Sequence, residues 1–370
     1  MGFTMGPSIP VLVHHSVGPG ENADPGVLEA HLRVLSRSGL PSLSTGELGD
    51  APKGFLLTFD DGFADAWTHA APLLERYGVK AVVFAIVSRL GEGDPRPQGV
   101  KPFEGRATAA LAAASQARGP HPAFLRWSEA LALEATGRVE IHSHSYEHRM
   151  GWSGDEIRGF HLGAGRGEHW SLSQSTGGDT RLGIPLYARR SALACRLYFD
   201  DPGLRDALAG WLAERGGAEY VAGRGREAVT TELAEVAQQY RTARGTFGRF
   251  ETDGEREART LEDLARAREA LEARLGGRRN ELCLPWGHYD ERTLEHARKA
   301  GIRRVYTTGR GYNPAGRIGY LVQRFAPLRR ENRERWLRSR LWIYRSCLRA
   351  GLYGALYGIR LSAPRQRVGT

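Results

Sequence analysis

Cysteine is scarce in this sequence: the 370 residues include only Cys195, Cys283 and Cys347, and no two of them form a Cys-x-x-Cys pair. This excludes a disulfide framework and a thiolate zinc site of the usual spacing. The first residues also lack a basic stretch followed by a long apolar core and a small-residue cleavage site, so we expect no secretory signal. Together these absences predict a cytoplasmic protein.

Acidic residues are fewer than basic ones. Asp and Glu number 42 against 52 Lys and Arg, which gives a net charge of +10 and a pI near 9.8. Such a surplus favours an anionic partner, which could be nucleic acid, phospholipid headgroups or a phosphorylated substrate, and charge alone does not distinguish them. The hydrophobic content of 41% is that of a globular protein.

Short apolar runs with β-branched residues recur along the chain, each bounded by polar residues or glycine. Their continuous rather than alternating hydrophobicity is typical of strands buried on both faces of a parallel sheet. The runs lie at 9–15, 54–61, 80–86, 138–144, 281–287, 303–309 and 320–327, and helical patterns lie at 24–39, 63–77, 127–136, 257–275 and 290–300. Strands alternating with helices predict an α/β fold, and about seven such units can close into a barrel.

Two stretches depart from this alternation. Residues 91–123 are rich in Gly, Pro and Ala, which predicts a long loop with one helix. Residues 150–255 carry many Arg and Gly with weak periodicity, which predicts a large insertion or lid. We therefore expect a barrel over residues 9–327, interrupted by the insertion at 150–255 and followed by a basic amphipathic segment at 328–370.

The basic C-terminal segment contains leucines at helical spacing, beside Trp336, Trp342 and Tyr344. The leucines are Leu337, Leu341, Leu348, Leu352 and Leu356. A membrane-spanning helix is disfavoured, because Arg345 and Arg349 would each cost roughly 2.5 to 3.5 kcal/mol at the bilayer centre. The pattern fits an amphipathic helix on an anionic membrane surface, and it fits equally a helix packed on the barrel with its basic face in water.

The strand predicted at 54–61 ends in LLTFDDG, where Asp60 and Asp61 stand side by side before Gly62. In a parallel α/β barrel the active site forms at the C-terminal ends of the strands. Two adjacent carboxylates repel each other, and a cation beside them is the simplest remedy. An isolated Asp-Asp pair is most often a solvated turn, so this pair alone decides nothing.

The strand predicted at 138–144 leads into HSHSYEH, which supplies His142, His144 and His148. If residues 144–148 form a helical turn, His144 and His148 share one face at a metal-chelating separation. Two histidines and one carboxylate leave open positions for water and substrate, as in catalytic zinc sites. A histidine-rich stretch alone is often surface, so the interpretation depends on both motifs lying at strand ends of one barrel.

TFDDG followed by HSYEH resembles the first two motifs of the polysaccharide deacetylases, the NodB-homology or carbohydrate esterase family 4 enzymes. The resemblance implies a distorted (β/α)7-type barrel. It also implies that Asp60 is the general base. Asp61, His144 and His148 would then be the ligands of a divalent metal, most often Zn2+, with Co2+ or Ni2+ as alternatives.

Two further motifs of the family are weaker here. LPWGHYD at 284–290 is similar to the third motif, in which Pro285 shapes the groove and the Trp286 N–H would help to hold the oxyanion. The last motif, Leu-x-x-His, carries the general acid but does not follow Pro285. Its pattern occurs instead in LVHH at the first predicted strand, so the acid role falls to His15, with His14 as the less favoured neighbour. This order resembles the circularly permuted branch that includes the biofilm poly-N-acetylglucosamine deacetylases.

One departure from the family pattern concerns Cys283, which stands where many relatives have an arginine two residues before the proline. An arginine that orients Asp60 must then come from elsewhere, and Arg324 at the end of the last strand is our candidate. A structural salt bridge is an equal alternative for Arg324. His142 could share the face of His144, and we expect it behind the metal ligands rather than among them.

The resemblance implies hydrolysis of an N-acetyl or N-formyl group on an amino sugar of a polysaccharide. The basic charge, the amphipathic tail and the missing signal lead us to expect a lipid-linked glycan. The enzyme would then be cytoplasmic and peripheral at the inner face of the membrane. A non-catalytic glycan-binding barrel is one alternative. A nucleic-acid-binding protein is another, but no recognisable binding motif accompanies the arginines.

Overall fold

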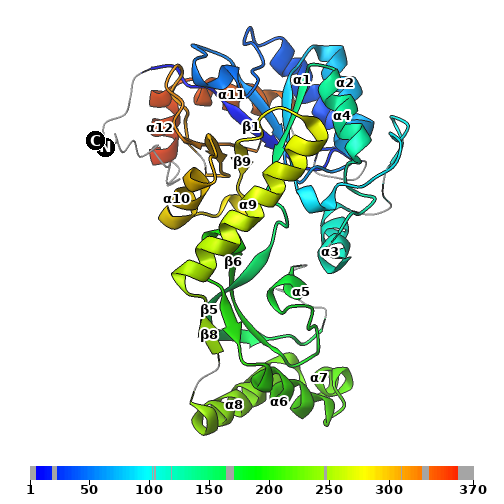
Figure 1. The fold of residues 1–370 in the computed structure, drawn as a ribbon, viewed down its shortest axis with the longest axis vertical. Coiled ribbons are helices and arrows are strands. Elements are labelled where there is room, and N and C mark those ends of the chain that lie inside the picture. The colour runs from blue at the N-terminus through cyan, green and yellow to red at the C-terminus, as the bar shows by residue number, and fades with distance from the viewer. Residues whose placement is uncertain are drawn as a thin grey trace. The chain divides into compact units, whose positions relative to one another are not determined.

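The computed structural model describes residues 6–18, 23–101, 103, 106–117, 119–163, 171–245, 248–309, 311–326 and 333–356 (Figure 1). The chain divides into two compact units. The first comprises Met1–Glu147, Leu261–His288 and Leu294–Thr370, and the second comprises His148–Thr260 and Tyr289–Thr293. In the described part of the chain, no helix has the length and apolar character needed to cross a membrane.

A seven-stranded parallel sheet forms the centre of the first unit. Its strands, in spatial order, are β1 (Val11–His14), β2 (Leu56–Phe59), β3 (Ala81–Ala85), β4 (Val139–Ser143), β9 (Glu281–Cys283), β10 (Arg304–Tyr306) and β11 (Leu321–Val322). A parallel bridge between Leu12 and Phe325 joins the two edges, and the Val13 N–H donates to the Phe325 carbonyl at 3.0 Å. The sheet thus closes nearly into a barrel, which confirms the predicted fold class.

Each predicted apolar run contains one of these strands. β1, β2 and β3 are buried along their whole length. Leu56 packs inside the barrel with Val11, whereas the next residue, Leu57, packs in the core outside the barrel with Leu12. Because both faces of each strand are covered, the hydrophobic pattern is continuous rather than alternating.

The main helices of this fold follow the predicted order. They are α1 (Pro25–Ser36), α2 (Ala71–Tyr77), α3 (Ala107–Ala117), α4 (Trp127–Ala135), α9 (Asp253–Leu275) and α10 (Glu291–Lys299). Asp24 caps α1 by accepting the Val27 N–H at 2.9 Å. Two helix boundaries differ from the prediction. A π-helical turn at Ala66–Ala70 precedes α2, and α9 begins at Asp253 rather than at 257.

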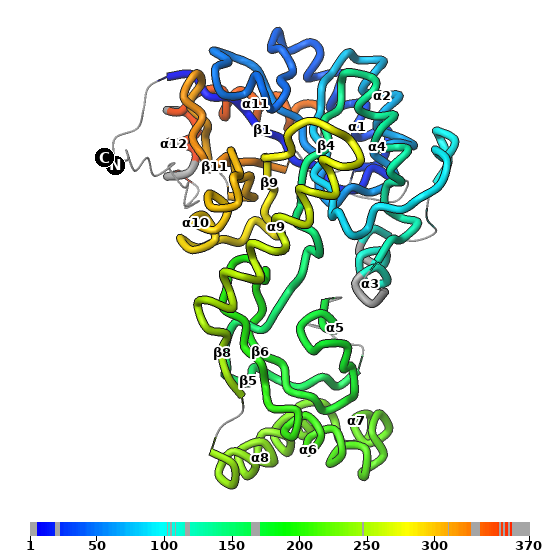
Figure 2. Tube along the Cα trace, in the orientation of Figure 1, coloured from blue at the N-terminus to red at the C-terminus, as the bar shows by residue number. Residues whose placement is uncertain are grey.

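The basic C-terminal segment forms two helices, α11 (Arg333–Tyr344) and α12 (Cys347–Leu356), instead of one. Leu337 and Leu341 of α11 are 0% and 4% exposed and share a core with α1, beside which α11 lies (Figure 2). For α11, the packed-helix alternative therefore describes the structure. Leu352 and Leu356 of α12 are 49% and 81% exposed, so contact of this helix with a membrane stays a prediction. The rest of the predicted segment, 328–332 and 357–370, lies outside the described residues.

The second unit has a core of its own. Antiparallel pairs join β5 (Met150–Phe160) to β6 (Pro185–Ser191) and β7 (Tyr198–Asp200) to β8 (Gly248–Phe250). Its helices are α5 (Leu172–Ser175), α6 (Pro202–Ala213), α7 (Ala218–Arg224) and α8 (Arg226–Arg244). Leu204 and Leu208 of α6 pack on Val229 and Leu233 of α8 in a cluster that excludes water. Weak overall periodicity therefore conceals an ordered hydrophobic core.

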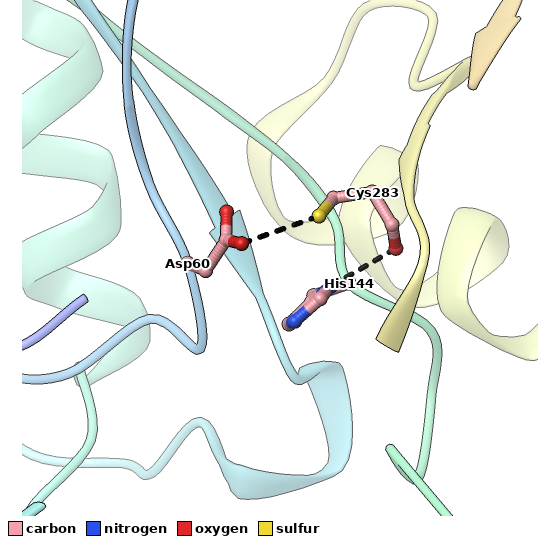
Figure 3. A group of neighbouring side chains, drawn as sticks. All are labelled: Asp60, His144 and Cys283. Carbon is pink, nitrogen blue, oxygen red and sulfur yellow. Dashed lines mark hydrogen bonds between the residues drawn. The ribbon is translucent and has the colours of Figure 1, made fainter. Parts of the chain in front are cut away.

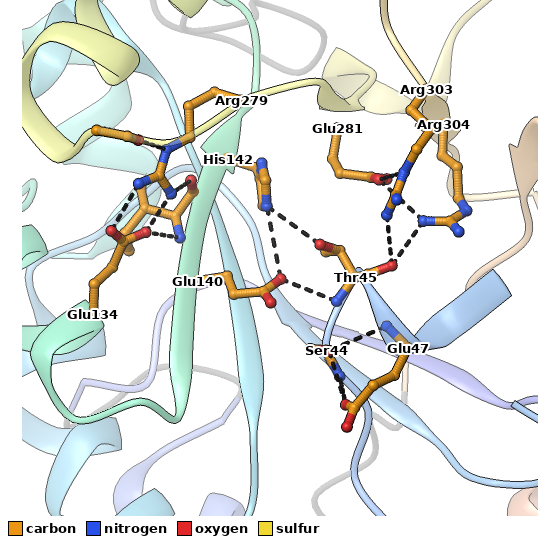
Figure 4. A network of polar contacts seen from close by, with 12 residues as sticks. Ser44, Thr45, Glu47, Glu134, Glu140, His142, Arg279, Glu281, Arg303 and Arg304 are labelled. Carbon is orange, nitrogen blue, oxygen red and sulfur yellow. Dashed lines mark hydrogen bonds and ion pairs between the residues drawn. The ribbon is translucent and has the colours of Figure 1, made fainter. Parts of the chain in front are cut away.

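A network of charges around the buried Glu281 lies where β9 and β10 begin (Figure 4). Glu281 is 0% exposed and accepts hydrogen bonds from Arg303 Nε at 2.8 Å and Arg304 Nη1 at 3.0 Å. Both arginines also donate to the Thr45 carbonyl at 2.7 Å. The N-terminal ends of barrel strands usually serve stability, so we assign this network to the scaffold.

Candidate active site

LLTFDDG forms β2 and the sharp turn after it. The Asp60 N–H donates to the His14 carbonyl at 2.9 Å and so continues the pairing of β2 with β1. Asp61 then takes a φ of 69° and Gly62 a φ of 73°. A Cβ on Gly62 would lie 2.8 Å from the Ala85 Cβ, so only glycine fits there. Because the backbone changes region between the two aspartates, their carboxylates reach different partners.

The Asp60 carboxylate forms a buried two-point ion pair with Arg324. Arg324 Nη1 lies 2.7 Å from Asp60 Oδ1 and Nη2 lies 2.8 Å from Oδ2, and the residues are 1% and 2% exposed. Arg324 also donates through Nε to the Thr307 carbonyl at 3.0 Å and through Nη1 to Thr58 Oγ1 at 3.1 Å. Burial alone would raise the pKa of Asp60, but the charge and hydrogen bonds of Arg324 hold it well below its ordinary value. Asp60 is therefore ionised.

Cys283 lies beside Asp60, and Figure 3 shows it with Asp60 and His144. Its thiol donates to Asp60 Oδ2 at 3.5 Å, and its sulfur accepts from Arg324 Nη2 at 3.0 Å. Burial raises the pKa of the Cys283 thiol, which favours the neutral form. The positive charge beside Asp60 thus comes from Arg324, which follows β11. Cys283 occupies the position where the family pattern has an arginine.

His14, the last residue of β1, and His15, which follows it, differ sharply in position. His15 Nε2 lies 3.9 Å from Asp60 Oδ2, and the His15 side chain is 49% exposed. His14 is 0% exposed, its ring centre lies 5.3 Å from that of His31, and burial lowers its pKa. Of the two, the structure brings His15 to Asp60.

Sequence reasoning missed Asp65, which holds the segment after His15. Asp65 Oδ2 accepts from the Val17 N–H at 2.8 Å and from the Ser16 hydroxyl. No motif marks this contact, because the partners are 48 and 49 residues apart in the chain.

Asp61, His144 and His148 form a buried group whose ligand atoms all lie within 4.8 Å of one another. His144 Nδ1 donates to the Cys283 carbonyl at 2.9 Å, so Nε2, which lies 3.5 Å from Asp61 Oδ1, is the nitrogen that could bind a metal. Two ligand atoms at zinc-bonding distance from a tetrahedral ion are about 3.4 Å apart. The donor types and the Asp61–His144 spacing therefore fit a divalent metal.

A second group that could hold a metal among the described residues consists of Asp60, His144 and Cys283. In this group a cation is already present, because the Arg324 guanidinium binds both Asp60 and the Cys283 sulfur. A metal there would have to displace a buried arginine. The group of Asp61, His144 and His148 is the better candidate.

The predicted helical turn over residues 144–148 is wrong. These residues form an irregular loop, in which Ser145 and His148 have φ values of 69° and 52°. The bends of this loop, not helical periodicity, bring His148 to His144. His142 belongs to neither candidate metal group and instead lies 3.7 Å from Glu140, in the network at the other end of the strands.

Pro285 and Trp286 lie in a one-turn helix, Pro285–Gly287, directly after β9. Trp286 has a φ of 56°, and its carbonyl accepts from Thr308 Oγ1 at 3.3 Å. A Cβ on Gly287 would lie 2.1 Å from Thr308 Oγ1, which explains the glycine of the motif. The turn is thus at the C-terminal end of the sheet, while the oxyanion role of the Trp286 N–H stays a prediction.

Comparison with known proteins agrees with this geometry. Residues 49–158 match the family model described as polysaccharide deacetylase, a segment that holds both aspartates and both histidines of the site. The match supports the polysaccharide deacetylase family for this segment of the chain. It is 32% identical over 93 residues to YxkH of Bacillus subtilis (strain 168), a polysaccharide deacetylase by name. That match covers 22% of this chain and 33% of YxkH.

Solved deacetylase structures share the fold. The de-N-acetylase from Aggregatibacter actinomycetemcomitans has a TM-score of 0.52 and 16% identity, covering 86% of this chain and 94% of its own. The BpsB deacetylase domain from Bordetella bronchiseptica has a TM-score of 0.50 and 19% identity, with 86% and 95% covered. IcaB from Ammonifex degensii has a TM-score of 0.50 and 17% identity, with 90% and 98% covered. At these identities the likeness supports the barrel, and the chemistry is argued from the residues.

Proposed function

We propose that this protein is a metal-dependent hydrolase that removes an N-acetyl or N-formyl group from an amino sugar in a polysaccharide or lipid-linked glycan. One observation carries the proposal: Asp60, ionised and paired with Arg324, directly precedes Asp61 in the chain. Asp61 forms the candidate metal group with His144 and His148. A base and a metal group at the C-terminal end of one barrel are the parts that amide hydrolysis needs.

In this proposal Asp60 accepts the proton of the attacking water, since it is ionised and held by Arg324. Asp61, His144 and His148 would hold a divalent ion, zinc in the first place, which supplies Lewis acidity to the amide carbonyl and to the water. The Trp286 N–H would stabilise the oxyanion. His15, exposed beside Asp60, would protonate the leaving amine.

The lipid-linked form of the substrate and a location at an anionic membrane are part of the proposal as well. Trp342 of α11 is 60% exposed, and the guanidinium of Arg349 in α12 lies 4.4 Å from its ring centre. Leu352 and Leu356 of α12 are exposed as well. Aromatic and leucine side chains rimmed by arginine suit an anionic interface. Sedimentation with anionic and with neutral vesicles tests this contact, and equal recovery from both would contradict it.

We expect the purified protein to release acetate or formate from N-acylated amino-sugar oligomers and to lose this activity when its metal is removed. Chelation followed by readdition of zinc, cobalt or nickel, with metal content measured at each step, checks both statements. Full activity after complete metal removal would contradict the metal role. No release from any N-acyl sugar by metal-loaded protein would favour the non-catalytic glycan-binding alternative.

We expect His15→Ala to lower amide hydrolysis by about 100-fold or more, because an amine leaves poorly without a proton. An aryl acetate ester provides the matched control, since its phenolate leaves without protonation. The variant should therefore retain most of its activity on the ester. Equal losses on amide and ester would show that His15 does not act as the acid.

A further inference from the structure

The loop that carries His144 and His148 is held from one side by the one-turn helix η3 (Val87–Arg89). The Val87 N–H donates to the Ser145 carbonyl at 3.3 Å, and the Ser88 N–H donates to the Tyr146 carbonyl at 3.0 Å. These bonds fix the carbonyl groups of Ser145 and Tyr146, two of the three residues between the two histidines.

Asp263 of α9 binds N–H groups of the same loop. Asp263 Oδ1 accepts from the Tyr146 N–H at 3.0 Å, and Oδ2 accepts from the Glu147 N–H at 3.2 Å. Hydrogen bonds to an ionised carboxylate are stronger than those between neutral groups. One helical turn further, the Arg266 guanidinium lies 4.1 Å from the centre of the Tyr146 ring, so two side chains of one α9 face hold this loop.

The loop has a specific need for such support. Ser145 and His148 are non-glycine residues at positive φ, a region that persists only when surrounding contacts impose it. His148 is also the residue at which the chain passes into the second unit. The N–H groups that Asp263 binds are thus the last anchored ones before His148.

We propose that Asp263 is a positioning residue for the metal group: by fixing the backbone at Tyr146 and Glu147, it sets His148 against His144 and Asp61. Asp263 itself belongs to neither group that could hold a metal, so it acts through the loop and not on the ion. The inference rests on the proposed function in one respect, that these ligands bind a divalent metal.

Zinc affinity is the direct measurement, obtained by competition with a chromophoric chelator on the full chain. We expect Asp263→Ala to weaken zinc binding about 10- to 100-fold, as is typical for residues that orient metal ligands. Asp263→Asn keeps one carbonyl acceptor, so its zinc affinity should lie between those of the wild type and Asp263→Ala. Glu269→Ala is the matched control, because Glu269 is an exposed carboxylate of the same helix, and it should bind zinc like the wild type.

Hydrogen exchange of the metal-free proteins separates this role from general destabilisation. In Asp263→Ala the amides of Tyr146 and Glu147 should exchange faster, while those of β3 keep their protection. Saturating zinc should then restore wild-type activity, since only affinity is reduced. If Asp263→Ala does not fold, Asp263→Asn provides the same two readouts.

Wild-type zinc affinity in the Asp263 variants, or unchanged protection at Tyr146 and Glu147, would overturn the inference while leaving the proposed function intact. A wild-type protein that binds no divalent metal would instead overturn the metal part of the proposed function, and the positioning role with it. The two failures are therefore distinguishable.

Discussion

Asp60→Asn is expected to lower deacetylation by about 10²- to 10⁴-fold, the range for loss of a general base, while bound metal stays at the wild-type level. Asparagine has the same shape and its carbonyl oxygen can still accept from Arg324, but it cannot take a proton from water. Asp60 is not a member of the group formed by Asp61, His144 and His148. Acetate or formate release, measured beside metal content, gives both quantities.

Asp61→Asn is the matched control, since it changes the adjacent carboxylate. It should lose metal and activity together, because Asp61 Oδ1 lies 3.5 Å from His144 Nε2 within the ligand group. If Asp60→Asn loses its metal, or keeps activity within tenfold of the wild type, the division of roles between the two aspartates is wrong.

The sheet was predictable from the sequence because its signal is local. A strand such as β2 presents Leu56 to the barrel interior and Leu57 to the core outside, so apolar residues follow one another and the run is visible. Strand ends were less predictable. The run 281–287 continues through Pro285 and Trp286, yet β9 ends at Cys283, since apolar character persists in the turn after the ladder stops.

The reactive residues were predictable for a similar reason: the two aspartates, and the two histidines of the metal group, are each close together in the chain. Arg324 was a candidate partner of Asp60 only because Cys283 stands where the family pattern has an arginine, so that the positive charge beside Asp60 had to come from another residue. Asp65 and Asp263 had no signal, because a carboxylate that binds backbone N–H groups 48 or 117 residues away leaves no local pattern. The leucines of α11 were ambiguous, since one amphipathic pattern suits both a membrane surface and a protein core.

Arg324→Met is expected to destabilise the protein by about 3 to 5 kcal/mol, because it leaves the Asp60 charge buried without a partner. Arg324→Lys should not restore full stability, since an ammonium group cannot make the two-point contact that Arg324 makes at 2.7 and 2.8 Å. Chemical unfolding of the full chain gives the free-energy differences. Arg76→Met is the matched control: Arg76 is 66% exposed in its pair with Glu29 at 3.1 Å, and its loss should cost at most about 1 kcal/mol.

The double variant Asp60→Asn/Arg324→Met decides whether the stability lost in Arg324→Met comes from the broken ion pair with Asp60 or from lost packing of the Arg324 side chain. Removing both charges should recover a large part of the stability lost in Arg324→Met, because the unpaired buried carboxylate is then gone. The pH dependence has a definite sign. With its folded-state pKa held low, Asp60 contributes stability that is present above the ordinary aspartate pKa and is lost as the pH falls toward the depressed value. Arg324→Met should lack this acid-dependent part, and a double variant no more stable than Arg324→Met would show that the guanidinium acts through packing alone.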